Sequence, residues 1–142
     1  MNLFIEKELN EFKQYHKNIY NVWFHIVCGF IFMVFMILSV PQYSNITLVL
    51  YSILLLVTLG SIAIPLVICI VLFVMQFIFA RFNLTPAYCM GLFVLFYFLP
   101  DLSHYLTNEP PMMDINNITP FTVFVNIFYL LPFSLICLTD PR

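Results

Sequence analysis

Residues 46–80, which read ITLVLYSILLLVTLGSIAIPLVICIVLFVMQFIFA, decide the fold of this chain and contain no charged side chain. As one straight helix this segment would be about 52 Å long at 1.5 Å per residue, whereas the hydrocarbon core of a bilayer is only about 30 Å thick. Gly60, followed closely by Pro65, supplies the signals that end one helix and begin another. The sequence therefore predicts two short membrane spans, residues 46–60 and 62–80, joined by a tight turn.

The composition of the whole chain agrees with a membrane protein. Of its 142 residues, 63% are hydrophobic and only 8% are charged, whereas a soluble domain carries roughly 25% charged residues. The net charge of −2 is too small to attract a nucleic acid. We therefore predict a single all-α domain, residues 1–142, that is an integral membrane bundle of about five spans and does not bind nucleic acid.

Three further apolar segments complete the predicted bundle: residues 22–40, 86–105 and 118–138. Thr85 is placed to cap the second of these helices, with Pro86 at the first helical position, where a proline is tolerated. Pro100 and Pro132 lie inside predicted spans, so each is expected to kink its helix.

The N-terminal residues 2–17 are predicted to form a short amphipathic helix that holds half of the charged residues of the chain. One face of this helix collects the residues at the spacing i, i+4, i+7 and i+11: Ile5, Leu9, Phe12 and His16. Such a helix lies flat on the membrane surface or packs across the mouth of the bundle. The first span that follows is too long for the apolar core of a signal peptide, so we expect it to be retained.

The lysines predict the orientation of the bundle. Lys7, Lys13 and Lys17 precede the first span, so the N-terminus is expected to be cytoplasmic. With two crossings in residues 46–80, Arg81 falls on the opposite side, which disagrees mildly with the rule that basic residues remain cytoplasmic. A single crossing would remove this disagreement, but it would leave the excess length of the segment unexplained.

Two of the three histidines frame a polar pattern at the start of the first span, His16-Lys-Asn18-Ile-Tyr-Asn21-Val-Trp-Phe-His25. Asn18, Asn21 and His25 fall at i, i+3 and i+7, so they share one face of a helix. On a straight helix His16 would point about half a turn away from His25. The two rings can meet only if the chain bends near residues 17–20.

The third histidine, His104, lies at the end of the span 86–105, with Asp101 on the same helical face and Ser103 and Glu109 close by. If residues 46–80 cross the membrane twice, His104 returns to the side on which His25 lies. If they cross once, it ends about 30 Å away across the bilayer. The double crossing therefore predicts that all three histidines gather in one layer.

Ionisable groups at membrane depth are costly and are usually functional. Imidazoles with a carboxylate and open positions are typical of non-haem iron(II) sites that activate dioxygen. The candidate metal ligands are His16, His25, His104 and Asp101, and the candidates for supporting or substrate-binding roles are Asn18, Asn21, Ser103 and Glu109. In the alternative interpretation, the histidines only cap helices or anchor them at the interface.

The string His16-x-Asn18-x-x-Asn21-x-x-x-His25, opening an apolar span after a short helix, resembles the signature of the 2-hydroxy fatty acid dioxygenase family. The fungal representative of that family acts in the breakdown of phytosphingosine to odd-chain fatty acids. The second family motif, a late histidine followed by an acidic residue and a proline, resembles the set His104, Glu109 and Pro111. The last span of the family carries a proline in mid-helix, which Pro132 resembles. The order and spacing of the spans agree over nearly the whole chain.

The chain departs from the family pattern at particular positions. Cys28 and Gly29 stand where the family has a proline-containing stretch, and Ser103 precedes His104 where the family often has glycine. What the resemblance implies is an Fe(2+)-dependent dioxygenase of the endoplasmic reticulum membrane. Its substrates would be dioxygen and a 2-hydroxy fatty acid, which it would convert to the acid one carbon shorter with loss of carbon dioxide.

Two other function classes compete with an enzyme. A non-enzymatic membrane protein, such as an assembly or scaffold factor, would keep the fold and bind no metal. A small transporter or channel is disfavoured, because few polar residues lie in the middle of the spans: Thr58, Ser61, Gln76 and Asn126. The sequence leaves the oligomeric state open, since short spans can relieve a thickness mismatch by associating.

Overall fold

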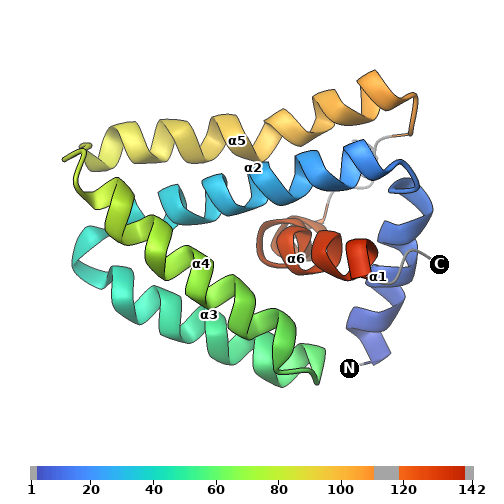
Figure 1. Cartoon of the computed structure of the whole chain (residues 1–142), viewed down its shortest axis with the longest axis horizontal. Helices are drawn as coiled ribbons and strands as arrows, with labels where there is room; N and C mark the ends of the chain where they lie inside the picture. The colour runs from blue at the N-terminus through green and yellow to red at the C-terminus, as the bar shows by residue number, and fades with distance from the viewer. Residues whose placement is uncertain (1–2, 111–118, 140–142) are drawn as a thin grey trace.

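The computed structural model describes residues 3–110 and 119–139, and within these ranges every regular element is a helix (Figure 1). The elements are α1 Leu3–Tyr15, α2 Ile19–Leu38, the short 3-10 helix η1 Pro41–Tyr43, α3 Ser44–Leu59, α4 Ala63–Ala80, α5 Pro86–Thr107 and α6 Pro120–Thr139. Helices thus occupy all six predicted segments. Pro111 of the second family motif and the predicted start of the last span at residue 118 lie outside the described residues, as does residue 2.

Among the residues that the structure describes, five helical segments are long and apolar enough to cross a membrane, namely α2, η1 with α3, α4, α5 and α6. Several boundaries differ slightly from those predicted, for local reasons. The helix α2 begins at Ile19 rather than at residue 22, because the side chain of Asn18 accepts a hydrogen bond from the backbone N–H of Tyr20 at 2.9 Å. Thr85 caps α5 and Pro86 occupies its first turn, as predicted.

The predicted break in the long apolar segment is confirmed at Gly60. This residue ends α3 in the left-handed conformation, with φ 64°, which glycine adopts without steric cost. The helices α3 and α4 then run back along each other as a hairpin (Figure 1). The Ser52 hydroxyl and the Cys69 sulfur link them at 2.8 Å. Residues 46–80 therefore traverse the bundle twice, as is required for His104 to lie on the same side as His25.

The helix α2 lies at the centre of the bundle. Figure 1 shows α2 and α5 side by side along their length, and α2 also packs on α4 and α6. Its side chains Phe32, Met33, Val34 and Ile37 are fully enclosed. The helix α1 buries its predicted apolar face and packs on α6, where the rings of Phe12 and Phe133 lie 5.6 Å apart. Of the two arrangements expected for α1, the structure therefore has the one in which it packs against the bundle.

The helices α2 and α6 approach each other closely at Gly29. A Cβ atom added at Gly29 would lie 3.2 Å from Cβ of Leu131, which is tighter than ordinary van der Waals contact. At Gly91, on the exposed face of α5, a Cβ atom would meet nothing within 4 Å. The two glycines therefore offer a matched pair for testing how tightly α6 is packed on α2.

We expect Gly29→Leu to destabilise the bundle by about 1–3 kcal/mol, because the added side chain must push α6 away from α2. Gly91→Leu should leave the stability unchanged or raise it slightly, since leucine favours a helix more than glycine does. Thermal unfolding of both variants in detergent checks this prediction. An equal loss in the two variants would contradict the close packing at Gly29.

Pro132 removes one backbone hydrogen bond from α6, and a side chain of α3 replaces it. Proline has no backbone N–H, so the carbonyl of Phe128, four residues earlier, lacks its helical partner. The hydroxyl of Tyr51 on α3 donates to this carbonyl at 2.9 Å. An unpaired carbonyl in an apolar environment is costly, so Tyr51 makes the proline tolerable and ties α3 to α6.

We expect Tyr51→Phe to cost about 1–3 kcal/mol of stability, since it leaves the partly buried Phe128 carbonyl unpaired. In a Pro132→Ala background the same change should cost less, because the alanine N–H can restore the helical bond. Melting temperatures of the two single variants and the double variant measure this coupling. Additive effects would mean that Tyr51 does not serve the carbonyl freed by Pro132.

Candidate metal centre

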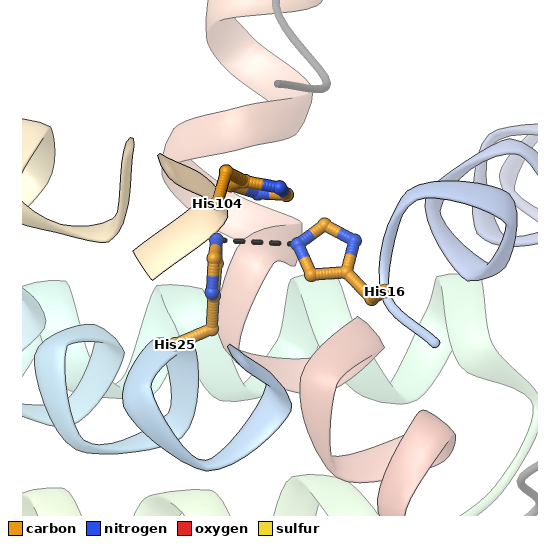
Figure 2. Close-up of side chains that lie close together, drawn as sticks. All are labelled: His16, His25 and His104. Carbon is orange, nitrogen blue, oxygen red and sulfur yellow. Dashed lines mark hydrogen bonds between the residues drawn. The ribbon is translucent and has the colours of Figure 1, made fainter. Parts of the chain in front are cut away.

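The chain bends between His16 and His25, as is required for the two rings to meet. The helix α1 ends at Tyr15 and α2 begins at Ile19, so His16 lies in the bend between them. The Nδ1–H of His16 donates to the carbonyl of Phe12 at 2.8 Å, and its ring stacks on the Phe12 ring with 3.6 Å between centroids. Both contacts hold the ring so that Nε2 faces the interior (Figure 2).

His25 is held in the same way from α2. Its Nδ1–H donates to the carbonyl of Asn21, one turn earlier, at 2.9 Å. A carbonyl oxygen only accepts hydrogen bonds, so in both His16 and His25 the ring proton is on Nδ1 and the Nε2 atom carries a lone pair. These two Nε2 atoms face each other at 3.2 Å (Figure 2). Two lone pairs at this distance repel each other unless a cation or a proton lies between them.

His104 completes the group from the C-terminal part of α5. Its ring centroid lies 4.7 Å from that of His16 and 5.0 Å from that of His25. One ligand nitrogen from each ring lies within 4.8 Å of the others. The three side chains are only 5%, 2% and 3% exposed for His16, His25 and His104, respectively. The prediction that the three histidines gather in one layer is therefore confirmed.

The spacing of the His16 and His25 nitrogens suits a shared metal ion. Two nitrogens that bind one ion at about 2.0–2.1 Å lie roughly 2.9–3.4 Å apart for angles between octahedral and tetrahedral, and the 3.2 Å between His16 and His25 falls in this range. Burial, followed in size by the effect of the neighbouring His25, lowers the pKa of His16 to about 2, so this ring is neutral. Neutral imidazole is the metal-binding form, and it suits zinc, copper, iron or nickel.

A polar network centred on Asn21 supports the rings. The Asn21 side chain is fully buried, and its amide nitrogen lies 3.2 Å from Nδ1 of His104 and 2.6 Å from Oε2 of Glu109. Its oxygen accepts a hydrogen bond from the hydroxyl of Ser103. The Asn21 backbone carbonyl also holds His25, so this one residue orients two of the three histidines.

Glu109 fastens the bend to the end of α5. Its Oε1 atom accepts hydrogen bonds from the backbone N–H groups of Lys17 and Asn18, both at 2.7 Å. The carboxylate therefore lies at the N-terminus of α2, where a negative charge is favourable. It reaches this position because Asn108 ends α5 with φ 56° and the Glu109 N–H bonds back to the His104 carbonyl at 3.0 Å. Asn18 and Glu109 thus support the site from outside it.

Asp101 occupies a different position from the three rings. It lies nearly one turn before His104 on α5, is exposed, and lines the cavity beside the histidines without joining their group. Its role as a ligand stays a prediction. The same cavity is lined by Tyr97 and Asn126, two polar residues that sequence reasoning did not assign to the site. The signal for Asn126 was its position as a polar residue in the middle of an apolar span.

The site therefore combines three converging imidazoles, a buried amide that orients them and a carboxylate that fixes the bend between α1 and α2. Such an arrangement could hold a metal ion beside a small cavity. No family model, curated protein or solved structure matches the chain.

Proposed function

We propose that this protein is a membrane-embedded, iron(II)-dependent dioxygenase that shortens 2-hydroxy fatty acids by one carbon. The observation that carries the proposal is the pair of unprotonated Nε2 atoms of His16 and His25, facing each other at 3.2 Å with His104 beside them. Ionisable side chains buried within membrane segments are costly and usually functional, so three buried imidazoles in an apolar bundle support a functional site. Iron(II) held by these rings would supply the binding and activation of dioxygen.

The surroundings of the site suit a lipid substrate. Most of the surface of α3, α4 and α5 is apolar and exposed, as expected for helices in contact with lipid. A fatty acid dissolved in the membrane would reach the site without crossing water. We place the protein in the endoplasmic reticulum membrane with a cytoplasmic N-terminus, on the family resemblance and on the lysines near the first span.

The reaction balances without an external reductant. One 2-hydroxy acid and one dioxygen give the acid one carbon shorter, carbon dioxide and water. The bond between the carboxyl carbon and the hydroxyl-bearing carbon breaks, the substrate supplies four electrons, and dioxygen accepts them. The protein residues have three tasks in this scheme: the histidines hold the ion, Asn21 orients the rings, and the surrounding apolar side chains exclude water.

The test is product formation by the purified protein. With iron(II), dioxygen and 2-hydroxypalmitate we expect the acid one carbon shorter, detected by mass spectrometry. The reaction should stop when iron is removed by a chelator and should be absent in His104→Ala. Bound metal without any product would favour a different reaction at this site. The absence of both metal and product would favour the non-enzymatic assembly or scaffold factor.

A further inference from the structure

A small cavity lies beside the three histidines, between α5 and α6. Its volume is about 30 Å³, which is room for roughly two water-sized groups. The residues that line it are His16, His25, Tyr97, Pro100, Asp101, His104, Asn126 and Leu130. Across the described part of the chain, α5 and α6 barely touch each other. The cavity therefore lies where α5 and α6 are apart, and it borders directly on the rings.

Asn126 is an unusual residue in this wall. Its side chain is only 7% exposed, yet no hydrogen-bond partner for its amide is found among residues 3–110 and 119–139. An amide that borders a cavity in an apolar bundle gains free energy by binding a water molecule or a polar ligand group there. The Asn126 side chain lines this cavity, so its amide is available to a polar group that enters the cavity.

The chemistry around Asn126 indicates what that partner is. A carboxamide both donates and accepts, so it matches a hydroxyl group, which does the same. Asp101 lines the same cavity. Beside this acidic residue, the neutral hydroxyl of a hydroxy acid is favoured over its carboxylate. Beyond the cavity, α5 carries the exposed apolar side chains Val94 and Phe98, close to its lining residue Tyr97. An alkyl chain can leave along this surface towards the lipid.

We propose that Asn126 is a substrate-binding residue that recognises the 2-hydroxyl group of a hydroxy fatty acid, whose alkyl chain leaves the site between α5 and α6. This inference rests on the proposed function, because it takes the hydroxy acid as the substrate. It adds the residue that distinguishes hydroxylated acids from plain ones and the route by which the chain reaches the membrane.

Equilibrium binding without turnover tests the proposal. Protein in detergent is loaded with iron(II) under anaerobic conditions, and the dissociation constants of labelled 2-hydroxypalmitate and palmitate are compared. The wild type should prefer the hydroxylated acid, and Asn126→Leu should reduce this preference about tenfold, the effect of one buried hydrogen bond. Asn126→Ala serves as a second variant in case leucine disturbs the folding of α6. The metal content of both variants should match that of the wild type.

Gln76→Leu is the matched control, because it also removes a carboxamide from an apolar helix but lies away from the cavity, bonded to Ser44 and Asn45. This variant should keep the full preference. An unchanged preference in both Asn126 variants would overturn the inference and leave the proposed function intact. Loss of metal in those variants would also overturn it, by making Asn126 part of the metal site. If the wild type holds metal but binds neither acid, the inference and the proposed substrate both fail.

Discussion

Replacing His25 with alanine is expected to reduce the metal content of the purified protein from about one ion per chain to nearly none. His25, on α2, supplies one of the two Nε2 atoms that face each other at 3.2 Å. Two imidazoles alone rarely retain a metal through purification, since protein metal sites generally have at least three protein ligands. Elemental analysis of the wild type and the variant, purified in parallel, measures the change.

Val27→Ala is a suitable control, since Val27 lies on the same helix with its side chain exposed and away from the rings. It should keep the metal content of the wild type. Adding metal should also raise the melting temperature of the wild type, because an ion that binds only the folded state stabilises it, but not that of His25→Ala. A wild type that carries no metal and shows no such stabilisation would contradict the candidate metal centre.

Much of the helical arrangement could be predicted from a length argument. The segment 46–80 is too long for one crossing, and Gly60 with Pro65 provides the break, so the return of the chain follows from the sequence. That return brings His104 to the side of His25. The bend between α1 and α2 could be predicted in a similar way, because His16 could meet His25 only with such a bend.

The sequence could not identify which polar residues line the cavity. Hydrophobic periodicity tells the inner from the outer face of a helix only when the faces differ in polarity. The helices α5 and α6 are apolar on nearly all sides, so the direction of Tyr97 and Asn126 depends on packing against other helices. The spacing of Asp101 from His104 correctly put both on one side of α5, but it did not show that Asp101 lies outside the group of rings.

The position of Glu109 also depends on tertiary structure. Its carboxylate reaches the start of α2 only because Asn108 adopts a left-handed conformation that reverses the chain at the end of α5. Spacing along the sequence placed Glu109 near His104, but it could not show the three N–H groups that it binds on the other side of the site. A residue selected as a neighbour of the metal site therefore holds together the segment that carries His16.

We expect Glu109→Ala to weaken metal binding about 10–100-fold, the usual effect of removing a partner that supports metal ligands. Without the carboxylate, the backbone N–H groups of Lys17 and Asn18 and the amide of Asn21 lose their acceptor. The bend can then open and take His16 away from the other rings. Competition with a chelator of known affinity measures the change in dissociation constant.

The variant Glu109→Gln distinguishes the loss of the hydrogen bonds that Glu109 accepts from the loss of its charge. Glutamine keeps one oxygen that can accept from the N-terminus of α2, so its metal affinity should lie between those of the wild type and Glu109→Ala. Glu6→Ala removes an exposed carboxylate from α1 and should bind metal as the wild type does. If Glu109→Ala keeps full affinity while its melting temperature falls, the carboxylate stabilises the fold without orienting the histidines. The metal centre would then depend on Asn21 and the helix carbonyls alone.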